Sequence, residues 1–234
     1  MPETITATAR DRLALALDTD DLVIALRVAR DLEPWFGVAK VGLELFSATG
    51  PEVVSALVER DWKVFLDLKL HDIPTTVGKA ARVLGALGAS YVTLHAHGGT
   101  DMLRAGVEGL RLGADRAGLD PPAAIAVTVL TSDDGAPPHI LGKRVAAAVE
   151  AGCAGIVCSA ADVREAKQLA PRLVAVVPGI RLPGDESHDH ARASAPEDAI
   201  VAGADLLVVG RAVTEAPDRV AAAMSLAGAV ERVT

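Results

Sequence analysis

Eight short strand-like runs alternate with eight longer helical stretches along this chain of 234 residues. The strand-like runs are rich in β-branched residues or Leu, and they span 13–17, 38–41, 64–68, 91–94, 125–129, 155–158, 173–176 and 206–209. The helical stretches span 21–32, 51–60, 75–87, 101–117, 140–150, 161–169, 196–202 and 217–227. Several of them begin with Pro or an acidic residue, and Gly88, Gly118, Gly152 and Gly203 stand where a glycine typically ends a helix.

This alternation predicts the fold class. Continuous apolar strands joined by helices are typical of a parallel sheet that is covered on both faces. Eight such units of about thirty residues close into a (β/α)8 TIM barrel, so we predict a single α/β domain over residues 1–234. An open, doubly wound sheet is the alternative. Against it, Asp-Thr-Asp-Asp follows the first run, and no Gly-x-Gly-x-x-Gly pattern opens a helix.

Composition narrows the class of partner. Lys and Arg number 23 and Asp and Glu 31, and a formal net charge of −8 repels polyphosphate, so we expect no nucleic-acid binding. No apolar run approaches the ~18 to 20 residues of a membrane span, and the start lacks a signal-peptide pattern, which predicts a cytoplasmic protein without a membrane partner. Cys153 and Cys158 lie in an apolar run and are interpreted as buried thiols. A metal site is the alternative, but no second ligand pair stands at a usable spacing.

Polar residues leave the strand-like runs at their carboxyl ends, where barrel enzymes carry their active sites. These residues are Asp18, Lys40, Asp67, Lys69, Asp72, His95, His97, Thr131, Gly210 and Arg211. Surface charges would scatter, whereas these fall at corresponding positions of successive units. The pattern therefore predicts one polar site at one end of the barrel.

An alternating array of lysine and aspartate is the centre of this candidate site. Asp67 and Lys69 are two apart on a strand, so we expect both side chains on one face, with Asp72 following in the loop. Lys40, on the neighbouring strand, can join them. Such an array satisfies itself electrostatically without a metal. An ion-pair network that only locks the barrel mouth is the structural alternative.

The ends of the seventh and eighth runs predict a phosphate site. Gly179-Ile-Arg181 and Gly210-Arg211 combine a close backbone with a charged donor, and these two loops commonly bind phosphate in barrels. Residues 179–194 form a long polar loop, which is typical of a functional lid, here one that closes over the phosphate. We therefore expect the substrate to carry a phosphate monoester, which the protein binds.

His95 and His97 alternate on one strand end and offer a second reading, a metal pair. Because Lys40 and Lys69 would repel a divalent ion nearby, we favour histidines that bond to the backbone or to their neighbours. We therefore expect no metal at these histidines.

Six segments resemble the orotidine 5'-phosphate decarboxylase family, in the family's order. They are Leu-Ala-Leu-Asp at 15–18, Lys-Val-Gly-Leu-Glu-Leu-Phe at 40–46, Phe-Leu-Asp-Leu-Lys-Leu-His-Asp-Ile-Pro at 65–74, Val-Thr-Val-Leu-Thr-Ser at 127–132, Pro-Gly-Ile-Arg at 178–181 and Val-Gly-Arg at 209–211. The similarity covers residues 13 to 220, and the Asp-x-Lys-x-x-Asp-Ile-Pro segment is its specific element. The resemblance implies cofactor-independent decarboxylation of orotidine 5'-phosphate to uridine 5'-phosphate, the last step of de novo uridylate synthesis.

The resemblance also assigns roles around the substrate. It implies that Lys69 donates the proton to C6 of the pyrimidine and that Asp67 lies beside the departing carboxylate. Asp18 and Lys40 would hold ribose hydroxyls, and Thr131 would bond the base. By the same resemblance, Gly210 and Arg211 bind the phosphate.

The resemblance further implies a homodimer with two shared sites, because Asp72, Ile73 and Thr76 would reach into the site of the second subunit. One position departs from the family pattern. Asp189 and His190 stand where the family usually has Asp-Gln, so His190 would take the place of a Gln that bridges base and phosphate.

Two rival functions remain. One is a magnesium-dependent sugar-phosphate decarboxylase or synthase of the same suprafamily, which resembles the Asp-x-Lys-x-x-Asp pattern but carries an acidic ligand where Lys40 stands. The other is a catalytically silent barrel that only binds a nucleotide.

Overall fold

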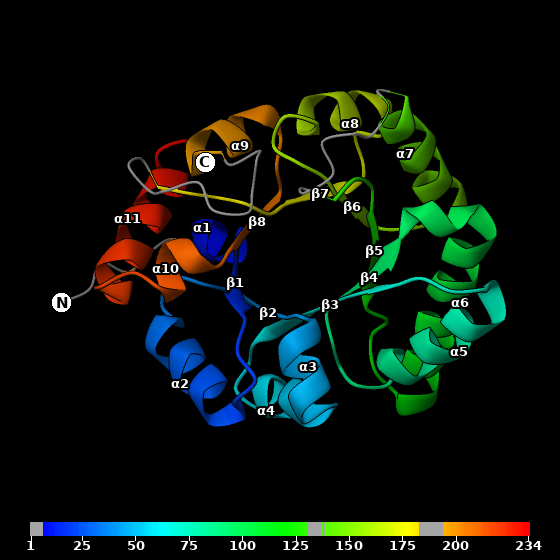
Figure 1. Ribbon diagram of the computed structural model, residues 1–234, viewed down its shortest axis with the longest axis horizontal. Helices are drawn as coiled ribbons and strands as arrows, with labels where there is room; N and C mark the ends of the chain where they lie inside the picture. Colours follow the sequence, from blue (N-terminus) through cyan, green and yellow to red (C-terminus); the bar gives the residue numbers. More distant parts are fainter. Residues whose placement is uncertain (1–6, 131–136, 138, 183–193) are drawn as a thin grey trace.

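Eight parallel strands close into a barrel in the computed structural model, which describes residues 7–130, 137, 139–182 and 194–234 (Figure 1). The strands are β1 Leu13–Leu17, β2 Val38–Val41, β3 Lys63–Leu70, β4 Tyr91–His95, β5 Ala123–Val127, β6 Gly155–Val157, β7 Val174–Val177 and β8 Leu206–Val209. Each strand pairs with the next, and β8 pairs with β1 in the register Leu13 to Leu207. This closure confirms the predicted TIM barrel and excludes the open sheet.

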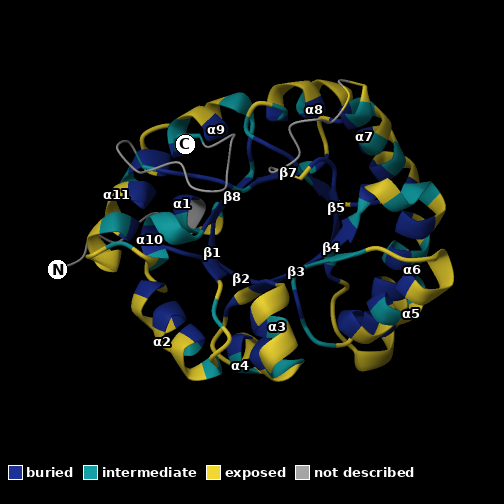
Figure 2. Ribbon diagram, in the orientation of Figure 1, coloured by how far each residue is buried: buried dark blue, intermediate teal, exposed yellow. Residues whose placement is uncertain are grey.

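Helices form an outer ring around the strands (Figure 1). They are α1 Ala7–Asp11, α2 Leu22–Leu32, α3 Leu43–Thr49, α4 Glu52–Val58, α5 Pro74–Gly85, α6 Gly99–Ala117, α7 Ile140–Ala151, α8 Val163–Leu169, α9 Pro196–Ala202, α10 Arg211–Thr214 and α11 Arg219–Glu231, with a short 3-10 helix η1 at Ala96–Gly98. Figure 2 shows buried residues on the strands and on the inward faces of the helices. No helix within the described ranges is long and apolar enough to cross a membrane.

Three of the four glycines that we expected to end a helix do so. Gly118, Gly152 and Gly203 cap α6, α7 and α9 in the left-handed conformation, where glycine avoids the Cβ penalty. The expectation for Gly88 was wrong. Helix α5 ends earlier, at Gly85, because the Ala86 N–H turns back to the carbonyls of Val83 and Leu84.

Inward-facing side chains, at every second position of the strands, fill the barrel interior below the site. The buried ones among them are Ala14, Ala16, Val38, Phe65, Ile125, Val176, Leu206 and Val208. Side chains two apart on a strand share a face, so the next inward positions after Ala16, Val38 and Phe65 are Asp18, Lys40 and Asp67. The polar residues therefore continue these apolar positions at the carboxyl ends of the strands.

Helices α5 and α6 approach each other through glycines. A Cβ atom at Gly109 would overlap the carbonyl oxygen of Gly78, and one at Gly113 would overlap the carbonyl oxygen of Arg82. Only hydrogen fits between the two backbones at these points. The two helices are therefore closely packed against each other.

Candidate active site

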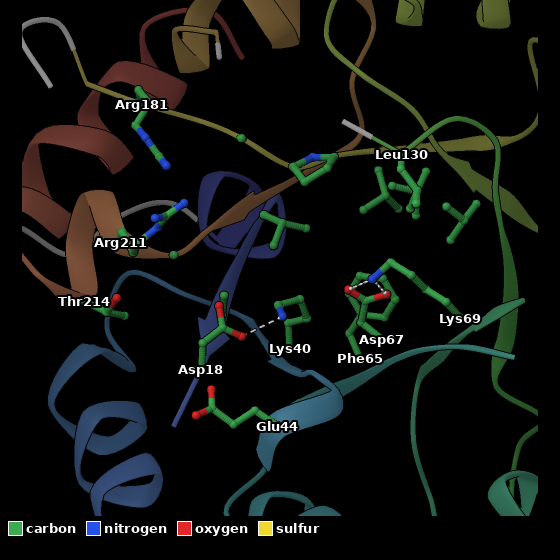
Figure 3. Close-up of a pocket in the computed structure, with 18 of the residues that line it drawn as sticks. Asp18, Lys40, Glu44, Phe65, Asp67, Lys69, Leu130, Arg181, Arg211 and Thr214 are labelled. Atoms are coloured by element: carbon green, nitrogen blue, oxygen red, sulfur yellow. Dashed lines mark hydrogen bonds and ion pairs between the residues drawn. The ribbon is translucent and has the colours of Figure 1, made fainter. Parts of the chain in front are cut away.

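A pocket of about 510 Å³ opens at the carboxyl ends of the strands (Figure 3). It is lined by polar residues of the candidate site together with residues that the sequence did not single out. The lining residues are Ala16, Asp18, Lys40, Glu44, Phe65, Asp67, Lys69, Val127, Val129, Leu130, Val157, Val176, Pro178, Gly179, Arg181, Val208, Gly210, Arg211, Thr214 and Glu215. The pocket is therefore a mixed one, with an apolar floor and a charged rim.

Lys69 and Asp67 form an ion pair in the pocket. The Lys69 Nζ lies 2.9 Å from Asp67 Oδ1 and 2.9 Å from Oδ2, and the side chains are 34% and 17% exposed. The prediction that both point to one side is confirmed, but its reason is incomplete. The regular alternation of β3 breaks between Leu66 and Leu70, and Lys69 takes a left-handed φ of 50°.

Lys40 pairs with Asp18 rather than with Asp67 or Asp72. Its Nζ lies 3.0 Å from Asp18 Oδ1, and the lysine side chain is 10% exposed. The register places Ala16 opposite Lys40, so Asp18 lies just beyond it at the end of β1. Gly42 leaves room for the pair, since a Cβ atom there would lie 3.0 Å from the ammonium nitrogen. The single alternating array that we predicted is thus two neighbouring ion pairs.

Asp72, Ile73 and Thr76 do not line the pocket of their own chain. All three are exposed, and the Asp72 carboxylate accepts a hydrogen bond from the N–H of Ile73. The expected fourth member of the array, Asp72, is therefore separate from Lys69 within one chain. Its carboxylate lies on the exposed loop before α5.

Two arginines lie on the side of the pocket away from Lys69 (Figure 3). Arg181, just after β7, is only 8% exposed, and its Nη1 donates to the Ile180 carbonyl over 3.0 Å. Its Nη2 is buried and has no hydrogen-bond partner among the described residues. Arg211 begins α10 directly after Gly210. An unsatisfied buried guanidinium nitrogen is costly, and an anion in the pocket would satisfy it.

Three expectations fall on residues that are not described. Thr131, His190 and most of the loop at 179–194 lie outside the described ranges. The ends of that loop are described: Ile180 and Ser194 form a parallel bridge, and the Arg181 N–H donates to the Ser194 carbonyl over 3.0 Å. The bridge fixes Arg181 at the base of the loop.

Glu44 and Thr214 line the pocket, and sequence reasoning missed both. Glu44 lies on α3 and Thr214 on α10, two short helices that the strand and helix pattern did not predict. Glu44 stands inside one of the family-like segments, and that was the available signal. Both helices follow their strands within two residues, which brings their side chains to the pocket rim.

The two histidines contact neighbours within the protein. His95 Nδ1 accepts from the His97 N–H over 3.2 Å, and His97 Nδ1 lies 3.1 Å from Nη2 of Arg144. Burial, together with the charges of Arg144 and the neighbouring histidines, lowers the pKa of His95 to about 4. No group of three metal-ligating side chains occurs within the described ranges. The two rings thus contact the backbone and a neighbouring side chain, and the absence of a metal here stays a prediction.

Cys153 and Cys158 are buried free thiols, as predicted. Burial raises the pKa of each to about 12, so neither is a nucleophile at neutral pH.

A closed (β/α)8 barrel with charged pairs at strands one to three and arginines after strands seven and eight defines a class, the barrel enzymes that act on a small phosphorylated substrate. Residues 11–226 match the family described as "Orotidine 5'-phosphate decarboxylase / HUMPS family". The chain belongs to this family, and the predicted class of enzyme, a decarboxylase of pyrimidine biosynthesis, is confirmed.

Individual relatives are similar over nearly their whole length. The orotidine 5'-phosphate decarboxylase of Moorella thermoacetica is 40% identical, over 100% of this chain and 97% of that protein. The enzyme of Thermobifida fusca is 44% identical, over 94% of this chain and 96% of that protein. The crystal structure of orotidine 5'-phosphate decarboxylase from Lactobacillus acidophilus has a TM-score of 0.79 at 32% identity, covering 94% of this chain and 99% of that one.

Proposed function

We propose that the pocket binds orotidine 5'-phosphate and that Lys69 protonates C6 of the pyrimidine as carbon dioxide leaves. When the bond between C6 and the carboxylate breaks, its electron pair stays on C6. No adjacent carbonyl can delocalise that negative charge, so the protein must stabilise it with a cation held in a fixed position. The observation that carries this assignment is the Lys69 ammonium, held by two equal hydrogen bonds of 2.9 Å at the pocket wall. The proton then passes from Nζ to C6.

Asp67 has two roles in this proposal. It fixes the Lys69 ammonium, and it places a negative charge beside the substrate carboxylate. Repulsion between the two carboxylates disappears when carbon dioxide forms, which favours the transition state over the bound substrate. The 17% exposure of the Asp67 side chain supports this role, because little water is present to screen the repulsion.

The rest of the substrate is assigned to the remaining polar groups. Asp18 and Lys40, paired at 3.0 Å, hold ribose hydroxyls, and Thr131 bonds the base. Arg181, Arg211 and the backbone at Gly210 bind the phosphate. The buried, unsatisfied Nη2 of Arg181 supports a phosphate at this end of the pocket. The His190 contribution to the phosphate stays a prediction from the sequence, as does the lid at 179–194.

A homodimer with shared sites is the second part of the proposal. The loop between β3 and α5 and the start of α5 are exposed from His71 to Thr76, and Ile73 in this loop has 65% of its surface accessible. A large apolar side chain at this exposure is suited to contact a second copy. Asp72 beside it would then enter the pocket of that copy.

The cytoplasmic location also stays a prediction.

The test is turnover of orotidine 5'-phosphate by the purified protein, followed as the loss of orotate absorbance. We expect activity without added metal and full activity after exhaustive chelation. Loss of activity on chelation, restored by magnesium, would favour the magnesium-dependent rival, in which an acidic residue replaces Lys40. Thermal stabilisation by uridine 5'-phosphate without any carbon dioxide release would instead indicate a barrel that only binds a nucleotide.

A further inference from the structure

Thr93 lies on β4 directly opposite the irregular part of β3. Leu66 of β3 pairs with Val92, whereas Leu70 pairs with Leu94. Residues 67–69 therefore stand opposite Thr93 alone. Such a bulge re-aims side chains and leaves backbone groups that the regular ladder does not satisfy.

The Thr93 hydroxyl contacts both members of the Lys69–Asp67 pair. The backbone N–H of Lys69 donates to Thr93 Oγ1 over 2.7 Å. The same hydroxyl donates to Asp67 Oδ1 over 3.1 Å. Because Lys69 Nζ in turn donates to Asp67, the three residues form a closed ring of hydrogen bonds. Thr93 has no exposed surface, so water does not compete for these bonds.

The backbone of Lys69 needs such a contact. A φ of 50° lies in the left-handed region, which costs free energy for any residue with a Cβ atom and persists only where surrounding contacts hold it. The Thr93 hydroxyl holds the N–H of this strained residue and, at the same time, the carboxylate that orients its ammonium.

We propose that Thr93 is a positioning residue for proton transfer: it acts through the bulge and Asp67 to aim the Lys69 ammonium, and it does not touch the substrate. The proposal rests on the role of Lys69 as proton donor. Thr93 is absent from the pocket lining, whereas Asp67 and Lys69 belong to it. Its side chain should therefore govern kcat and leave substrate binding intact.

The experiment compares Thr93→Val, which keeps the branched shape and removes the hydroxyl, with Thr93→Ser, which keeps the hydroxyl. Misplacement of a reacting group by about 1 Å costs on the order of 100-fold in rate, so we expect kcat of Thr93→Val to fall about 10- to 100-fold. The KM for orotidine 5'-phosphate and the Kd for uridine 5'-phosphate should stay within about threefold, a split that indicates an interaction used only in the reaction step. Thr93→Ser should recover most of kcat.

Thr128→Val is the matched control. Thr128 is likewise without exposed surface, follows the neighbouring strand β5, and donates its hydroxyl to the Val157 carbonyl over 2.7 Å, but it does not line the pocket. Both valine variants lose one buried hydroxyl, so their urea midpoints report a purely structural effect. We expect kcat to fall in Thr93→Val and to stay near the parent value in Thr128→Val.

Several outcomes would overturn the proposal. They are an unchanged kcat in Thr93→Val, an equal loss in Thr128→Val, a rise in KM alone, or a Thr93→Ser variant as slow as Thr93→Val. Lys69→Ala, assayed alongside, separates this failure from a wrong proton donor. If Lys69→Ala is inactive and Thr93→Val is fully active, only the positioning role falls, whereas an active Lys69→Ala overturns both.

Discussion

Both carboxylate oxygens of Asp67 lie at the same distance, 2.9 Å, from the ammonium nitrogen of Lys69. This symmetric pair sits at the end of β3, where the strand departs from regular geometry. At the opposite end of the same strand, Lys63 forms an ion pair with Asp11 at 2.8 Å, and this pair lies on the surface. The two lysines of β3 therefore give a direct comparison of a pocket pair with a surface pair.

Lys69→Ala should abolish turnover while uridine 5'-phosphate still binds. The substitution removes the proposed proton donor and leaves the arginines at the far side of the pocket intact. Steady-state kinetics and product titration measure the two effects. Lys63→Ala is the control and should keep its activity, because exposed ion pairs contribute only about 0 to 1 kcal/mol. Turnover of Lys69→Ala within about tenfold of the parent would contradict the assignment.

Arg181→Ala should weaken the phosphate contact. A hydrogen bond to a charged group is worth about 1.5 to 3 kcal/mol, so kcat/KM for orotidine 5'-phosphate should fall roughly 10- to 100-fold. The same variant should process orotidine, which lacks the phosphate, as slowly as the parent does. Arg172→Ala is the control, because Arg172 is exposed and precedes β7 at the opposite end of the strand. An equal loss with both substrates would mean that Arg181 supports the fold and not the phosphate.

Asp72→Asn and Lys69→Ala proteins should complement each other if sites are shared between two copies. Each variant is expected to be inactive alone. After mixing and subunit exchange, a heterodimer has one site with both intact residues and one with both lesions, so activity should return to part of the parent value. The measurement is turnover before and after exchange, with exchange followed by a tag on one variant. No recovery despite exchange would show that Asp72 acts within its own chain.

Gly113→Ala should destabilise the protein although alanine is the better helix former. Its Cβ atom would overlap the Arg82 carbonyl across the α5–α6 contact, and overpacking typically costs about 1 to 3 kcal/mol. Gly228→Ala in α11 is the matched control, because the nearest heavy atom to its Cβ would be the Arg232 guanidinium at 3.9 Å. We expect Gly228→Ala to raise the free energy of unfolding by about 0.4 to 1 kcal/mol. Urea unfolding of both variants decides whether the close contact governs stability.

His95 should make the protein less stable in mild acid. Its pKa is lowered from 6.5 to about 4 in the folded protein, mainly by burial. Between these two values the unfolded chain binds a proton that the folded protein does not, so the free energy of unfolding falls as the pH drops. His95→Asn should lose less stability than the parent between about pH 7 and pH 5, in urea unfolding. His139→Asn, at an exposed position, should follow the parent, and equal losses in all three proteins would contradict the role of His95.

Most strands were predictable because they are short apolar runs, although β3 includes charged residues and β5 begins and ends two residues before the predicted run. The bounds of β1, β2 and β8 agree with the sequence prediction at every residue. Helices α3 and α10 were missed because they are short, seven and four residues, and they follow their strands almost directly. A pattern of hydrophobic periodicity needs a longer window than these segments offer.

It was easier to predict which residues line the pocket than which of their side chains form ion pairs. Strand ends indicated Asp18, Lys40, Asp67 and Lys69, and all four line the pocket. The pairing depends on the register between β1 and β2 and on the left-handed φ of Lys69, and neither follows from residue spacing. Thr93 was missed for a related reason, since a threonine inside an apolar run reads as an ordinary strand residue until its hydroxyl is placed in space.

The pairing of β8 with β1 removes every free edge from the eight strands of the barrel. An open sheet can recruit another chain by adding a strand, through backbone hydrogen bonds that do not depend on sequence. This barrel offers no such route, so the homodimer that we propose would associate through side chains on loops and helices. The affinity within such a dimer would then change by substitution at exposed positions such as Ile73, while the hydrogen bonds of the sheet stay intact.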